Sequence, residues 1–140
     1  MKKICKITVV LLLFILSIKI HAQQIDTLQY LKETFEAKKA DYIGKPFSCI
    51  LNKMDKIYPQ SVFSMPSVYN ITLTEVTKFY FILPKQGLGK NVIYIYIKWE
   101  TPIPTKDVDN TEKIDKSGFT PEKKVFYGSK IVKDLKIIKM

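Results

Sequence analysis

Few side chains in this sequence are of the types that carry out acid–base, nucleophilic or metal chemistry. The chain of 140 residues has one histidine, His21, and two cysteines, Cys5 and Cys49, and it has no arginine. His21 and Cys5 belong to an N-terminal segment that has the character of a removable leader. The rest of the chain therefore lacks an imidazole base, an imidazole ligand and a pair of thiols. We expect no serine–histidine or cysteine–histidine catalysis, no metal site and no cofactor.

Two glutamates are the best remaining candidates for catalysis. Glu75 and Glu100 each flank a predicted strand, and a glycosidase needs two carboxyl groups on opposite sides of a cleft. Both also fit the ordinary charges found at strand ends, and a small domain leaves little material for a cleft beside its core. We therefore predict that the protein is not an enzyme, and we keep a small carboxylate-based hydrolase as an alternative.

Tyrosine and lysine share one side of a predicted β-hairpin. Residues 77–83 and 92–100 are β-branched and aromatic runs of strand length, and the stretch between them is rich in turn residues. Side chains alternate between the two faces of a strand, so one face is an apolar row of isoleucine, phenylalanine and tryptophan that must be covered. The opposite face carries the candidate binding residues, which are Tyr80, Tyr94, Tyr96, Lys78 and Lys98.

This second face has the composition of a binding surface. Tyrosine rings offer flat amphipathic area that can stack on sugar rings, peptides or bases, and the lysines attract anions. Without arginine there is no planar bidentate recognition of phosphate, so we expect diffuse anion binding and no specific nucleic-acid partner. The expected partner is a protein or an anionic envelope polymer or glycan. The alternative is that helices cover this face as well and leave only the hydroxyl groups at its rim.

The N-terminal residues resemble a secretory signal peptide. Lys2, Lys3 and Lys6 precede the apolar run 7–18, which is shorter than the about 20 residues that cross a bilayer. We expect cleavage after Ala22, so that residues 1–22 are the signal peptide and residues 23–140 form a single domain in the periplasm or outside the cell. A retained anchor is the alternative, and membrane contact is expected only through an uncleaved leader.

Removal of the leader lowers the positive charge of the protein. Four lysines would leave with it, so 19 lysines would face 13 acidic residues, and the formal net charge would fall from +10 to +6. A basic protein outside the cytoplasm meets anionic lipids and glycans. The same excess also fits a lysine-rich surface whose role is solubility.

The remaining segments supply the elements that cover the hairpin. Periodicity and capping residues predict helices at 26–40, 46–57 and 120–127. Alternation predicts a strand at 68–74 and a lysine-bearing edge strand at 130–138, whereas 58–67 reads as a loop and 105–117 as a solvated excursion. The predicted fold class is α+β, with two N-terminal helices packed on an antiparallel sheet of three to four strands and a short helix before the last strand. Cys49 falls on the apolar face of the second helix, where we expect a buried free thiol in a monomeric protein.

Three stretches of the sequence carry a resemblance. The leader end His21-Ala22-Gln23, the junction Tyr42-Ile-Gly-Lys-Pro-Phe47 and the closing Phe126-Tyr-Gly-Ser-Lys-Ile-Val-Lys-Asp-Leu135 resemble small uncharacterised exported proteins of Bacteroidota. The resemblance implies no particular activity. From the residues we expect an exported, non-enzymatic binding module for a protein or cell-envelope partner, with an inhibitor or immunity-type protein as a further alternative.

Overall fold

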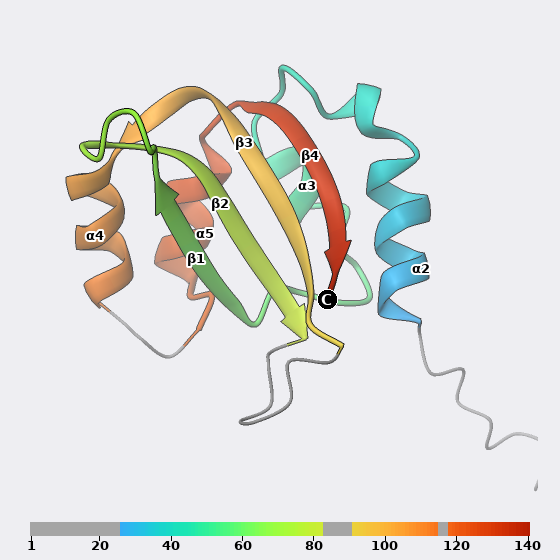
Figure 1. Cartoon of the computed structure of the whole chain (residues 1–140). Helices are drawn as coiled ribbons and strands as arrows, with labels where there is room; N and C mark the ends of the chain where they lie inside the picture. The colour runs from blue at the N-terminus through green and yellow to red at the C-terminus, as the bar shows by residue number, and fades with distance from the viewer. Residues whose placement is uncertain (1–25, 83–90, 115–117) are drawn as a thin grey trace, which may run out of the picture.

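The computed structural model describes residues 26–82, 91–114 and 118–140. The predicted signal peptide, its cleavage site and the hairpin residues 83–90 lie outside these ranges. The chain forms one antiparallel four-stranded sheet in which each strand pairs with the next along the sequence, in the order β1-β2-β3-β4 (Figure 1). The strands are β1 (Ser61–Pro66), β2 (Leu73–Ile82), β3 (Ile93–Pro104) and β4 (Val132–Lys139).

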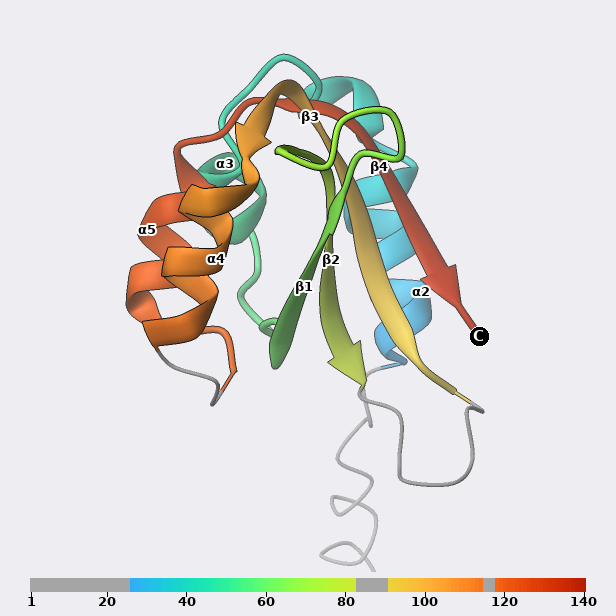
Figure 2. The same ribbon diagram turned by 60° about the vertical axis from the view of Figure 1, so that its left-hand side comes forward.

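The helices are short and frame one side of the sheet. They are α2 (Thr27–Leu31), which runs on into the π-helical turn η2 (Lys32–Glu36) and the 3-10 turn η3 (Lys39–Asp41), then α3 (Ser48–Leu51), α4 (Thr105–Ile114) and α5 (Pro121–Gly128). Figures 1 and 2 show α3 and α5 on the same side of the sheet, with α2 alongside β4. No helix in the described residues crosses the opposite side. The predicted α+β class, the antiparallel sheet and the short helix before the last strand are confirmed.

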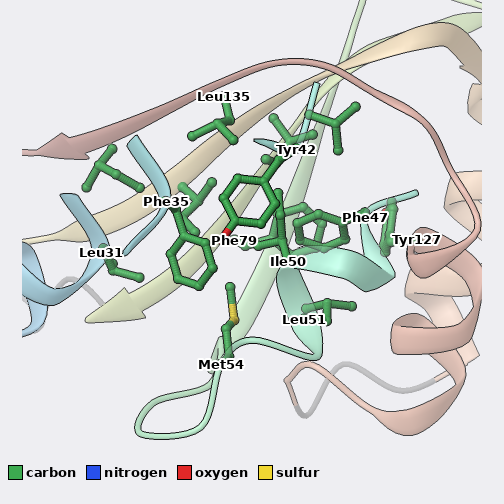
Figure 3. Packing of buried hydrophobic residues seen from close by; sticks show 14 of the residues in the cluster. Leu31, Phe35, Tyr42, Phe47, Ile50, Leu51, Met54, Phe79, Tyr127 and Leu135 are labelled. Atoms are coloured by element: carbon green, nitrogen blue, oxygen red, sulfur yellow. The ribbon is translucent and has the colours of Figure 1, made fainter. Parts of the chain in front are cut away.

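The core lies between these helices and the inward face of the sheet. Phe35, Phe47 and Ile50 from the N-terminal helices are fully buried, and in Figure 3 they lie close to Phe79 and Leu135 of the sheet. The rings of Phe47 and Phe79 are tilted at 31° to each other with their centroids 4.5 Å apart, and Trp99 meets both rings edge to face. The apolar row predicted for the hairpin is therefore the inward face, which is covered as expected.

The first predicted helix begins where the sequence indicates. The Asp26 carboxylate accepts a hydrogen bond from the Gln29 backbone N–H at 3.1 Å, which caps α2. Farther along, the Glu36 carboxylate accepts a hydrogen bond from the backbone N–H of Ile137 at 2.9 Å. This contact ties the helical segment to β4. It also gives a partner to one backbone N–H on the free edge of that strand.

The second helix is much shorter than predicted. Only Ser48–Leu51 are helical instead of 46–57, and Met54 reaches the core through a turn in which its N–H donates to Leu51. The segment is held by the start of β4 and the residues just before it, because the Val132 N–H donates to the Lys45 carbonyl at 3.0 Å and the Phe47 N–H donates to the Lys130 carbonyl at 2.9 Å. On this single turn Ile50 and Leu51 take the core positions. Cys49 is a free, half-buried thiol, so the prediction of a buried one is wrong.

Two predictions between residues 58 and 74 are wrong, because the structure has a strand where a loop was predicted and a loop where a strand was predicted. The predicted loop contains the edge strand β1, and most of the predicted strand at 68–74 is an exposed loop. Strand β1 turns the polar Ser64 inward, where its hydroxyl is hydrogen-bonded to Thr77 and Tyr127. Pro66 lies at a register shift at the end of β1, a position where a missing N–H is tolerated.

The predicted solvated excursion at 105–117 is also wrong, because most of it forms α4. Val108 is buried in the core cluster, and the Glu112 carboxylate accepts a hydrogen bond from the Tyr127 hydroxyl. By contrast, α5 follows its sequence signals closely. Its cap is Thr120, whose hydroxyl accepts from the Lys123 N–H, and Pro121 occupies the first turn.

Candidate functional site

The strand registers align the outward side chains in rows across the sheet. Residues directly opposite each other in an antiparallel pair share one face. The first row is Ser61, Tyr80, Tyr94 and Ile138, the second is Phe63, Lys78, Tyr96 and Lys136, and the third is Met65, Val76, Lys98 and Asp134. We call these rows the outward face. All five residues predicted as a binding site lie on it, brought together from β2 and β3.

The two central strands carry an aromatic cluster. The ring centroids of Tyr80 and Tyr94 are 5.1 Å apart, and the Lys78 ammonium lies 5.2 Å from the centroid of the Tyr94 ring. Tyr94 is only 5% exposed although no helix of the described chain lies over it. Tyr80 and Lys78 on the neighbouring strand both contact its ring. Tyr80, Tyr96, Lys78 and Lys98 are half-buried and keep part of their surface for a ligand.

The phenol of Tyr80 is neutral at physiological pH. Burial, and secondly the neighbouring Tyr94, raise the pKa of Tyr80 above its ordinary value of 10.0. A neutral phenol can both donate and accept a hydrogen bond. This ring therefore offers a stacking surface and a hydroxyl group, and it adds no negative charge to the outward face.

The charge of the outward face is positive. Lys78, Lys98 and Lys136 stand in its rows with a single acid, Asp134, which forms an ion pair with Lys39. Burial of Asp134 opposes ionisation, but the hydrogen bond and charge of Lys39 outweigh it and hold the pKa of that carboxyl below its usual value. The acid is thus already neutralised by a lysine from outside the rows, and the face presents lysine charges to a ligand.

Strand β1 adds residues that the sequence did not point to. Phe63 is 55% exposed and Met65 is 39% exposed, and both extend the outward face toward its edge. They were missed because residues 58–67 read as a loop. The sequence from Ser61 to Met65 has no regular polar–apolar alternation, because Val62 and Phe63 are adjacent apolar residues, and a proline lies on either side of the stretch.

A buried chain of hydrogen bonds fixes β1 from the inward side. The Tyr127 hydroxyl donates to Glu112 Oε1 at 2.6 Å, so Ser64 must donate to Tyr127 and Thr77 must donate to Ser64. The Trp99 indole N–H completes the chain by donating to Thr77 Oγ1 at 2.9 Å. Every buried side-chain nitrogen and oxygen in the described residues has a partner. This series of hydrogen bonds is a structural support of the edge strand β1.

The two candidate catalytic acids lie at one irregularity of the sheet. The pairing of β2 with β3 shifts between Thr74 and Val76, and Glu75 and Glu100 both fall within that shift. Glu100 is exposed and Glu75 is half-buried. A shallow hollow of about 350 Å³ lies elsewhere, lined by Tyr58, Pro59, Phe119, Thr120, Pro121 and Lys124. Neither acid lines it, so this hollow gives no support to a paired-carboxylate site.

Across residues 26–82, 91–114 and 118–140, no three histidine, cysteine or acidic side chains gather as a metal site requires. Within the same ranges, no helix has both the length and the apolar character needed to cross a bilayer.

Comparison with family models, curated proteins and solved structures gave no match. The outward face is the feature of the described residues that bears most directly on function.

Proposed function

We propose that this protein is an exported, non-enzymatic binding module whose outward face holds an anionic glycan of the cell envelope. The observation that carries the proposal is the alternation of aromatic rings and lysines, in register, on a sheet face that no described helix covers. The leader-like N-terminus supports a location in the periplasm or outside the cell. The absence of histidine after residue 21 supports a binding role over catalysis.

The chemistry of the face suits a sugar polymer that carries carboxylates. Tyr80, Tyr96 and Phe63 offer flat surfaces on which sugar rings can stack. The lysines between them are compact point charges, which attract a carboxylate without requiring one fixed geometry. A sheet presents such groups at regular spacings, about 4.8 Å from strand to strand. A linear polymer can therefore meet several of them at once.

The direct experiment compares an acidic glycan with its neutral form. Calorimetry with polygalacturonate and with its methyl ester uses the same sugar backbone, and only the first carries negative charge. We expect the secreted protein to bind polygalacturonate more tightly, with residual affinity for the ester through stacking. Equal affinity for polygalacturonate and its methyl ester would show that the lysines do not contribute to binding. No affinity for either would exclude the glycan and favour a protein partner, including the inhibitor alternative.

A substitution separates stacking from charge. Tyr96→Ala should weaken binding of both glycans by roughly tenfold, since stacking on an aromatic ring is worth about 1–3 kcal/mol. Glu75→Gln and Glu100→Gln should leave binding unchanged. Hydrolysis of either glycan, lost in these two glutamine variants, would support the hydrolase alternative instead.

A further inference from the structure

The loop that joins β1 to β2 carries three of the four most exposed large apolar side chains in the described residues. Val68 is 88% exposed, Tyr69 is 96% exposed and Ile71 is 76% exposed. We call residues 67–72 the tip loop. In Figure 2 it stands at the end of the sheet where β1 ends, clear of α3 and α5. From residue 57 to residue 74 the sequence has no lysine, aspartate or glutamate. The tip is thus uncharged as well as apolar.

Hydrogen bonds hold the tip loop in one shape. The Asn70 side-chain oxygen accepts from the N–H of Thr72 at 3.0 Å and from the Thr72 hydroxyl at 2.7 Å. The Ser67 hydroxyl accepts from the Tyr69 N–H, and the Ser67 N–H donates to the Leu73 carbonyl. A loop fixed in this way loses little conformational freedom when its side chains enter another phase.

The first residue of α4 secures the loop from the other side. The Thr105 hydroxyl donates to the Ile71 carbonyl at 2.9 Å, and the Thr105 N–H donates to the Thr72 carbonyl at 2.8 Å. Unpaired backbone groups are costly in an apolar medium, and these bonds pair several of those next to the exposed side chains. The loop is therefore suited to contact with a medium that contains little water.

We propose that the tip loop inserts Val68 and Ile71 into the surface of a lipid bilayer, with the Tyr69 ring at headgroup level. Tyrosine is enriched at that depth because its ring is apolar and its hydroxyl is polar. A protein partner fits less well, because a stable protein interface takes about 20–30 residues on each side and the tip offers three side chains. Two inserted side chains and one ring at headgroup level suffice for weak, reversible attachment to lipid.

Lipid charge should matter little for this attachment. Lys106 follows Thr105 at the base of the loop, but Asp107 comes directly after it and offsets its charge. Vesicles of phosphatidylcholine alone should therefore bind the protein nearly as well as vesicles that also contain phosphatidylglycerol. Strong preference for phosphatidylglycerol would instead indicate adsorption through surface lysines and would overturn the proposal.

The test uses fluorescence and sedimentation with the secreted protein. Trp99 is 1% exposed and should not respond to vesicles, so a Tyr69→Trp variant reports on the tip. We expect its emission to shift to the blue with phosphatidylcholine vesicles and to be quenched by brominated lipid. Val125→Trp is the matched control, since Val125 on α5 is 76% exposed, as Ile71 is, and should show neither effect.

Removal of the apolar side chains gives the second arm. Replacement of Val68, Tyr69 and Ile71 by serine should lower vesicle partitioning by about 100-fold or more, because the two inserted side chains, Val68 and Ile71, each contribute at least roughly tenfold. Val125→Ser should partition like the wild type, and so should Lys78→Gln, which affects only the outward face. Equal melting temperatures would show that the triple variant is folded. Unchanged partitioning of the triple variant would overturn the proposal. So would a wild-type protein that has no affinity for vesicles but binds a stoichiometric protein partner that the triple variant does not bind.

Discussion

The ammonium of Lys78 lies 5.2 Å from the centroid of the Tyr94 ring, on the outward face of the sheet. A cation over an aromatic face is attracted by the electron density of the ring. The Tyr94 ring also packs against Tyr80, and it is almost completely buried. Tyr94 is thus part of the support of the site, whereas Tyr80, Tyr96 and the lysines keep surface available for a ligand.

This difference between two neighbouring tyrosines gives a stability prediction. Tyr94→Ala removes a buried ring and should lower the free energy of unfolding by about 2–4 kcal/mol. Tyr96→Ala removes a half-buried ring and should cost about 1 kcal/mol or less. Urea unfolding of both variants measures the two values. Equal costs would mean that the rings share one environment and that Tyr96 is not available to a ligand.

The hydrogen bond between Tyr127 and Glu112 predicts how stability depends on high pH. Burial, followed by the bond to Glu112, raises the pKa of Tyr127 far above its ordinary value. Folding therefore favours the neutral phenol. The contribution of this phenol to the free energy of unfolding is fully present below the unfolded pKa of about 10. It is lost as the pH rises above that value, because the unfolded chain then binds fewer protons than the folded chain.

Removal of the hydroxyl isolates this effect from the other groups that titrate at high pH. Tyr127→Phe should cost about 1–2 kcal/mol at neutral pH, since Glu112 and Ser64 each lose a partner. Above a pH of about 10, the difference in free energy of unfolding between the variant and the wild type should narrow. Denaturant unfolding at neutral and alkaline pH gives both differences. A difference that is constant with pH would show that Tyr127 is not the group responsible.

The predicted leader has a direct test in the mass of the exported protein. Cleavage after Ala22 gives a species that begins at Gln23, which can cyclise and lose its amino charge. Intact-mass measurement of the protein from periplasmic or culture fractions should find this species. A full-length mass in the membrane fraction would support the retained anchor.

The sequence predicted most securely the elements whose signals are local. Alternation in β2 and β3 assigned Ile95 and Tyr96 to opposite faces, and Thr120 with Pro121 marked the start of α5. Strand β1 was missed because its inward Ser64 is stabilised by Thr77 and Tyr127, which are distant in the sequence. The tip loop was mistaken for a strand because its alternation is a genuine strand pattern that the turn at Asn70 overrides.

The same distinction applies to the candidate site. Its five predicted residues come from two strands that are neighbours in sequence, so local alternation was enough to bring them together. Lys136 and Phe63 belong to the outer strands, and their place in the rows depends on strand order and register. Those depend on long-range pairing, which a single sequence does not reveal.

The most direct test of the account is the salt dependence of polygalacturonate binding by the wild type and by a Lys78→Gln, Lys136→Gln double variant. Lys32→Gln, an exposed lysine on the helical segment away from the rows, is the matched control. The double variant should bind roughly fivefold to tenfold more weakly at low salt, since an exposed charge pair contributes about 0.2–1 kcal/mol. The difference should shrink as salt screens the lysines. Wild-type affinity in the double variant, or an equal loss in Lys32→Gln, would contradict a glycan site on the outward face.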